Sequence, residues 1–235
     1  MPFTISVAGQ VRQIKLSQSK ALWPLFETVV NSIQSLEETK ENNKEIIIEA
    51  IRDSNVSLKL TSDNNTVEEP SHFEEFVVID NGNGFNSENY TSFLEAYSQY
   101  KVKKGCKGIG RFLWLKAFEE VSIDSIFFEN GKWYRKVFSF SIRGIEPEDN
   151  VQELNGEFYQ RSTRVNLKRF KPVYRDAVAY KLDSLAKKII EHCLPYFILG
   201  ACPQIVLKDN FGEKIPLNYF YDNTYKNSLH TDEMI

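Results

Sequence analysis

The sequence predicts an α+β protein in which helices pack on one face of a mixed, mainly antiparallel sheet. Two observations support this fold class. The elements follow one another as helix, strands, helix, glycine-rich segment, helix and strands. Strands therefore come in groups, whereas a parallel sheet arises from single strands that alternate with helices. A two-layer sandwich is the expected architecture.

Residues 20–40 carry apolar residues at helical spacing and are expected to form a helix, with Ser17 as its N-cap. Pro24 lies near the start of this helix, where proline is tolerated. Residues 3–13 alternate loosely and are expected to form an edge strand. Next we expect strands at 46–51, 56–60 and 75–79, a loop at 61–71, a helix at 87–97, a basic glycine-containing segment at 100–111 and a helix at 111–118.

The second half is expected to be rich in strands. We expect strands at 121–128, 133–140 and 161–167, a polar loop at 146–150, a long amphipathic helix at 174–196, strands at 204–207 and 215–217, and a turn at 210–212. Residues 1–200 are expected to form the main domain. Residues 201–235 are expected to be a strand-and-turn extension that begins a following domain of a longer protein.

Composition excludes several classes of protein. The chain has 235 residues, of which 42% are hydrophobic and 26% charged, and its net charge is -3. These values are ordinary for a globular protein and give no overall attraction to nucleic acid or to an anionic membrane. Three cysteines without a C-x-x-C motif argue against a disulfide scaffold or a zinc site, and favour the cytoplasm. The start of the chain does not resemble a signal peptide.

Glu27 and Asn31 are four residues apart in the first expected helix, so they share one helical face. A carboxylate at this position can orient or deprotonate an attacking water molecule, and an amide oxygen suits Mg²⁺. An ordinary polar helix face is the alternative interpretation of this pair.

The motif D-x-G-x-G follows directly after an expected apolar strand, at Asp80, Gly82 and Gly84. Glycines allow the backbone to turn tightly while the aspartate side chain points into a cavity. A carboxylate there can accept a hydrogen bond from an exocyclic amine such as that of adenine. The alternative is a hairpin turn, although the helix expected after it argues against this.

A basic glycine-rich segment precedes the next helix, and it has the pattern G-x-x-G-x-G. Backbone N–H groups of such a segment can approach phosphates, and the helix N-terminus adds partial positive charge. The segment lacks the G-K-[ST] of a Walker A loop, and no strand precedes it as in a Rossmann fingerprint. A flexible basic loop is the alternative. The candidate nucleotide ligands are Lys104, Gly105, Lys107, Gly108, Ile109, Gly110 and Arg111.

Thr163 lies on a late strand, where its hydroxyl can hydrogen-bond to a buried base. By itself it is better explained as a β-branched residue of a strand. The order of all four features along the chain is more specific than any one of them.

The set of motifs resembles the GHKL ATPase superfamily, which includes type II topoisomerase ATPase domains, MutL proteins, heat-shock chaperones, histidine kinases and MORC proteins. The similarity spans residues 27–163, and the run GIGRFLWLKAF at residues 108–118 most resembles MORC-like bacterial ATPases. One departure is Ser162, which stands where the superfamily usually has a glycine before the threonine. A second is that we cannot place the lysine that many relatives supply to the γ-phosphate.

The resemblance implies a Bergerat fold that binds ATP and Mg²⁺ between helices and sheet. It implies that Glu27 activates water, Asn31 binds Mg²⁺, Asp80 reads adenine and the glycine-rich segment closes over the phosphates as a lid. It further implies a slow ATPase that forms an ATP-dependent homodimer and acts as a switch for a downstream domain or partner. A link to DNA or to genome defence follows from analogy alone.

Two other functions share the same binding residues. A non-catalytic, ATP-gated binding module would differ only in turnover, so Glu27 alone separates it from an ATPase. A phosphotransferase similar to a histidine kinase is a weaker alternative. None of the three histidines lies in a visible dimerisation hairpin, and kinases of the superfamily generally lack a glutamate at the position of Glu27.

Overall fold

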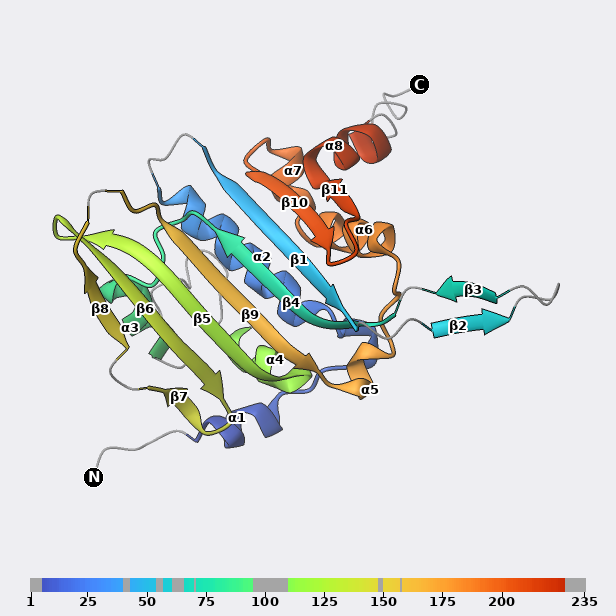
Figure 1. The fold of residues 1–235 in the computed structure, drawn as a ribbon, viewed down its shortest axis with the longest axis horizontal. Helices are drawn as coiled ribbons and strands as arrows, with labels where there is room; N and C mark the ends of the chain where they lie inside the picture. Colours follow the sequence, from blue (N-terminus) through green and yellow to red (C-terminus); the bar gives the residue numbers. More distant parts are fainter. Residues whose placement is uncertain are drawn as a thin grey trace, which may run out of the picture.

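The computed structural model describes residues 6–39, 43–53, 57–60, 66–69, 71–94, 110–147, 150–156 and 158–226. Figure 1 shows a large curved sheet with helices packed behind it. The architecture is therefore a mixed α/β arrangement with an open, mostly antiparallel sheet, and the expected fold class is confirmed at this level.

Within the described residues the sheet has nine strands. From one edge to the other they are β11 (Lys214–Pro216), β10 (Gln204–Asp209), β1 (Glu45–Arg52), β4 (Phe73–Asp80), β9 (Ser162–Phe170), β5 (Phe118–Glu129), β6 (Lys132–Ser141) and β7 (Gly144–Glu146), while β8 (Val151–Leu154) also pairs with β6. Among the described pairs only β1 and β10 are parallel. Strands β2 (Ser57–Leu60) and β3 (Thr66–Glu69) form a separate antiparallel pair.

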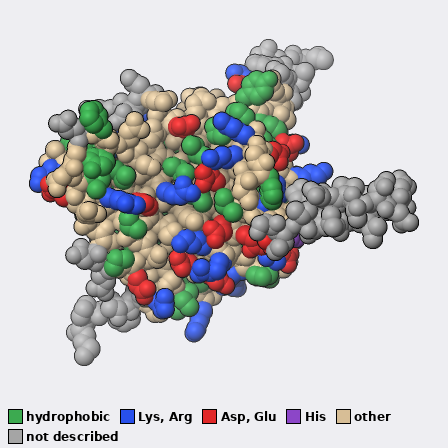
Figure 2. All heavy atoms as spheres, in the orientation of Figure 1, with side chains coloured by type: hydrophobic (Ala, Val, Ile, Leu, Met, Phe, Trp, Pro, Cys, Tyr) green, Lys and Arg blue, Asp and Glu red, His purple; other side chains and the backbone are tan. Residues whose placement is uncertain are grey.

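Three helices, α2 (Trp23–Glu37), α4 (Gly110–Ala117) and α6 (Leu182–His192), lie behind the sheet in Figure 1. Period-two burial along β1 shows which face of the sheet they cover, because Ile46, Ile48 and Ala50 are fully buried and Glu49 between them is not. The opposite face carries hydrophobic and charged side chains mixed together (Figure 2). On that face Glu49 forms ion pairs with Lys208 and Arg164, on strands β10 and β9.

Shorter helices complete the chain. These are α1 (Val7–Gln13), η1 (Gln18–Lys20), α3 (Ser87–Leu94), α5 (Pro172–Arg175), α7 (Leu194–Ile198), α8 (Leu217–Tyr221) and the final turn η3 (Asp222–Lys226). Among the helices that the structure describes, none combines the length and the apolar character needed to cross a membrane.

Four expectations about local structure are wrong. Ser17 does not cap the first expected helix: α2 begins at Trp23 after Leu22, and Ser17 precedes the separate turn η1 without a side-chain capping hydrogen bond. Part of the expected edge strand, residues 7–13, is helix α1, because the Ser6 hydroxyl caps it by accepting a hydrogen bond from Gly9 N–H and Val11 packs into the core. The expected long helix at 174–196 is divided into α5, α6 and α7. Pro195 lies at the start of α7, where its missing N–H does not interrupt a helix. The expected loop at 61–71 contains strand β3.

The segment after residue 200 joins the same sheet through β10 and β11. An ion pair between Arg52 and Asp209 (2.9 Å) connects β1 to β10, and both side chains are almost completely buried. Arg52 also donates hydrogen bonds to the carbonyl groups of Ser71 and Tyr180. The division of the chain at residue 200 and the assignment of 201–235 to a following domain stay predictions.

Candidate functional site

Asp80 is the last residue of β4, and the residue is only 5% exposed. Two donors hold it: the Ser32 hydroxyl of α2 at 2.7 Å and the Gly82 N–H at 2.9 Å. Burial raises the pKa of Asp80 to about 6, although both hydrogen bonds act in the opposite direction. A buried carboxylate is therefore fixed in one orientation at the end of a central strand.

The loop after Asp80 connects β4 to helix α3, so the hairpin alternative is excluded. It is fixed from both sides. The Asn83 N–H donates to Ser35 of α2 (3.0 Å), and the Asn89 side chain of α3 donates to the Gly84 carbonyl (2.7 Å). Both glycines of the motif are needed sterically. A side chain at Gly82 would overlap Ser35, and Gly84 has a φ of +69° and packs against Ser125.

Thr163 lies beside Asp80, because the two residues are partners in the register between β4 and β9. Its hydroxyl is 2.9 Å from the Ser125 hydroxyl of β5, and the two share a hydrogen bond. Ser125 also accepts a hydrogen bond from the Phe85 N–H (3.0 Å) and is 0% exposed. The structure thus brings Asp80, Gly84 and Thr163 together, as expected, and adds Ser125 between them.

Glu27 and Asn31 lie on α2 and are partly exposed. The Glu27 carboxylate faces the start of α4: a Cβ atom placed on Gly110 would lie 2.8 Å from Glu27 Oε2. Burial raises the pKa of Glu27. Within the described part of the chain, neither Glu27 nor Asn31 has a hydrogen bond or an ion pair, so both side chains are available to a ligand.

Helix α2 is joined to the D-x-G-x-G loop by two serines that the sequence analysis missed, Ser32 and Ser35. They are three residues apart and therefore lie on neighbouring positions of one helical face. Ser32 immediately follows Asn31. Ser32 is a polar residue on the apolar, buried side of its helix, and this is the sequence signal that could have indicated a buried polar contact. Together the serines hold Glu27 and Asp80 in a fixed relation.

The glycine-rich segment is described only from Gly110 onward. Gly110 is the first residue of α4, and Arg111 follows it with a guanidinium group that donates to the Ser92 carbonyl (3.2 Å). Arg111 lies over the rings of Phe93 and Phe112, and burial lowers its pKa to about 10. The other predicted ligands, Lys104, Gly105, Lys107, Gly108 and Ile109, lie outside the described residues.

The side chains present fit a Mg²⁺ ion that arrives with a nucleotide. Such ions are held mainly by phosphate oxygens and water, with one or two oxygen atoms from the protein. Asn31 offers one amide oxygen of this kind. Among the residues that the structure describes, no three His, Cys, Asp or Glu side chains form a cluster that could hold a metal without a nucleotide.

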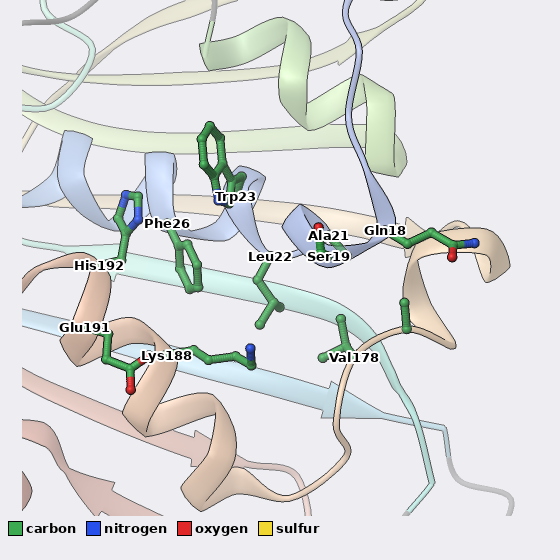
Figure 3. A pocket seen from close by; sticks show the side chains of 11 residues that line it. Gln18, Ser19, Ala21, Leu22, Trp23, Phe26, Val178, Lys188, Glu191 and His192 are labelled. Atoms are coloured by element: carbon green, nitrogen blue, oxygen red, sulfur yellow. The ribbon is translucent and has the colours of Figure 1, made fainter.

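A separate cavity of about 290 Å³ lies between the start of α2 and α6 (Figure 3). Trp23 and Phe26 of α2 line one side of it, and the ring of His192, at the end of α6, stacks on Phe26 with 4.6 Å between ring centroids. Lys188 and Glu191 line the α6 side. None of the predicted site residues lines this cavity, so it is distinct from the candidate nucleotide site.

The candidate site therefore combines a buried acceptor, a neighbouring hydroxyl and a separate carboxylate, each placed by a different element. Comparisons with known proteins identify no family for the chain: no protein-family model matches it, and no curated protein matches it significantly.

Proposed function

We propose that this chain is a GHKL-type domain with a Bergerat fold that binds ATP with Mg²⁺ and hydrolyses it. One observation carries the proposal. The loop that carries Asp80 and Gly84 meets Thr163, which comes from a distant part of the sequence, beside the neighbouring strands β4 and β9, and α2 is hydrogen-bonded to the same place. If these motifs were only an ordinary helix face, a hairpin turn and a strand threonine, nothing would require them to lie together in the fold.

The proposed base site is the pair Asp80 and Thr163. A carboxylate held by Ser32 and Gly82 keeps further lone pairs for a donor from the ligand, and the exocyclic amine of adenine is such a donor. Because the carboxylate is buried, a hydrogen bond to it is not weakened by competing water. These features support adenine as the base.

The proposed phosphate site lies along α2. Asn31 would hold Mg²⁺, which neutralises phosphate charge when it is bound. Glu27 would orient the attacking water and accept its proton, and its raised pKa makes it a better base than an exposed glutamate. Gly110, the last glycine of the proposed lid motif and the first residue of α4, lies against Glu27.

In this proposal the domain is a slow ATPase that works as a conformational switch. Closure of the lid around ATP would favour a homodimer and act on a downstream domain or partner protein. A cytoplasmic location is part of the proposal that rests on the low cysteine count, and a link to DNA or to defence rests on the family resemblance alone.

The test combines ATP titration by calorimetry, in the presence of Mg²⁺, with an assay of phosphate release. We would compare the wild type with Glu27→Gln, Asp80→Asn and the control Glu37→Gln, which changes an exposed glutamate of the same helix. We expect Glu27→Gln to bind ATP without turnover, Asp80→Asn to lose binding, and the control to behave as the wild type.

Other outcomes distinguish the alternatives. Binding without turnover in the wild type would favour a non-catalytic, ATP-gated module. If the wild type does not bind ATP at all, the proposed function is wrong and the motifs are loops and a polar helix face.

A further inference from the structure

Ser125 is a fully buried hydroxyl in the apolar inner face of β5, and both of its described contacts belong to the candidate site. It accepts a hydrogen bond from the Phe85 N–H, next to Gly84, and it shares a hydrogen bond with Thr163. Val121, Ile123 and Phe127 occupy the neighbouring inward positions of the same strand. An isolated serine in such a row costs free energy unless its hydrogen bonds are satisfied.

The direction of the hydrogen bond between the two hydroxyls follows from this requirement. A serine hydroxyl has one proton and two lone pairs. One lone pair of Ser125 already accepts from Phe85. Either direction leaves one proton without an acceptor among the described residues. If Ser125 donates to Thr163, that proton is on Thr163, which is 5% exposed and lies beside Asp80, where a bound ligand can accept it; in the reverse direction it is on Ser125, which is 0% exposed. A ligand acceptor beside Thr163 therefore favours the first direction by roughly tenfold or more in population, because an unsatisfied buried donor is costly.

Ser125 therefore determines what Thr163 can do. The Thr163 oxygen accepts the Ser125 proton, so its own proton is free to donate, and within the described residues it has no acceptor. Thr163 is only 5% exposed, and it is the partner of Asp80 in the register between β9 and β4. The site then presents an acceptor, Asp80, next to a committed donor, Thr163.

We propose that Ser125 is a positioning residue that fixes the proton of Thr163 and thereby sets the preference for adenine over hypoxanthine. This inference rests on the proposed function. Adenine presents a donor (the amine) next to an acceptor (N1), which complements Asp80 and Thr163. Hypoxanthine presents an acceptor (O6) next to a donor (N1–H), which is the opposite pattern. Without Ser125 the Thr163 hydroxyl can rotate and serve as either donor or acceptor.

The test measures the affinity for ATP and for inosine triphosphate by calorimetry. The variants are Ser125→Ala, Thr163→Val, their combination, and the control Ser122→Ala, which makes the same change on the opposite face of β5. We expect the wild type to prefer ATP by about tenfold or more, which corresponds to one well-placed hydrogen bond. In Ser125→Ala this ratio should fall several-fold, with most of the change in ATP affinity.

The double variant separates positioning from a general loss of structure. If both residues act through one proton, Ser125→Ala should add little to the loss already caused by Thr163→Val. An unchanged ratio of the two affinities in Ser125→Ala, or effects of the two substitutions that simply add, would overturn the inference while leaving ATP binding intact. A wild type that binds neither nucleotide would instead overturn the proposed function and this inference with it.

Discussion

The hydroxyl of Ser32 donates a hydrogen bond of 2.7 Å to the buried carboxylate of Asp80, and this contact joins helix α2 to the end of strand β4. The helix that carries Glu27 is thereby fixed relative to the residue proposed to read the base. Hydrogen bonds from Ser32 and Gly82 oppose the effect of burial on the pKa of Asp80, and no positively charged group of the described residues contributes to this. Keeping this carboxylate ionised in the folded protein therefore lowers the free energy of unfolding.

Asp80→Asn should remove nucleotide binding without destabilising the protein. The pKa of Asp80 is raised from 3.8 to about 6, so ionising it in the folded state at neutral pH costs on the order of 3 kcal/mol. An asparagine has the same size and no charge, and Ser32 can accept from its amide. We expect the free energy of unfolding at pH 8, measured with urea, to be equal to or above that of the wild type. A loss of more than about 1 kcal/mol would contradict this cause of the pKa shift.

The pH dependence of stability should reveal the same group. A carboxylate whose pKa is raised by folding binds its proton more tightly in the folded state. Its stabilising effect is therefore present below pH 3.8 and is lost as the pH rises through about 6. We expect the difference in unfolding free energy between wild type and Asp80→Asn to change between pH 4 and pH 6 and to be constant above pH 7. A difference that does not vary with pH would show that Asp80 titrates normally.

Gly84→Ala should destabilise the fold more than Gly131→Ala. Both glycines have positive φ, at +69° and +81°, so both alanines carry backbone strain of about 1 kcal/mol. Only at Gly84 would the new Cβ atom also lie 2.6 Å from Ser125 Oγ and 3.1 Å from Phe127 Cβ, whereas nothing lies within 4 Å at Gly131. The difference between the melting temperatures of the two variants measures the steric part of the destabilisation, because backbone strain is common to both. Equal losses would indicate that the loop can move away from β5.

Gly110→Ala should impair hydrolysis and leave ATP binding largely intact. The added methyl group would lie 2.8 Å from Glu27 Oε2, and the flexible glutamate side chain would have to move. Because binding of the base depends on Asp80, we expect a decrease of about tenfold or more in kcat with little change in affinity. Gly9→Ala is the control, since its Cβ would meet Ser6 only at an ordinary 3.6 Å. An unchanged kcat would show that the position of Glu27 is not critical.

Arg52→Met should destabilise the protein by about 3–5 kcal/mol, because it leaves the buried Asp209 without its partner. The matched control is Arg135→Met. Arg135 pairs with Asp124 at 2.6 Å, but both side chains of this pair are exposed, so the expected loss is below about 1 kcal/mol. Urea unfolding of both variants gives the comparison. Similar losses at the two positions would mean that water reaches the Arg52 pair.

Much of the fold follows from local sequence patterns. Helix α2 and strands β1, β4, β5, β6 and β9 were predicted close to their observed positions, because long periodic runs are strong signals. The sequence of helix α1 was interpreted as a strand because so short a segment fits both the helical and the strand periodicity. The cap at Ser6 favours the helix. The division of the expected helix at 174–196 depends on how α6 and α7 pack, which periodicity does not reveal.

The candidate site was predictable to the extent that it depends on residue type and spacing. Asp80, Gly84 and Thr163 do lie together, and Glu27 does lie against Gly110. The polar contacts from Ser32 and Ser35 depend on how helix α2 packs against the loop after β4, and the contact from Ser125 depends on the register between β5 and β9. Neither the packing nor the register is encoded in a single segment, so the partners of these serines could be identified only in three dimensions.

The parallel pairing of β1 with β10 has a consequence for how the chain is made. One edge of β1 pairs with β4, which follows soon after it in the sequence. The other edge can pair only after β10 (Gln204–Asp209) has been synthesised. During synthesis the backbone groups of Ile46 and Ile48 on that edge would stay unpaired until nearly the whole described chain has left the ribosome. An unpaired central strand with buried apolar residues is prone to pair with other chains, so this interval is the one in which a chaperone would matter most.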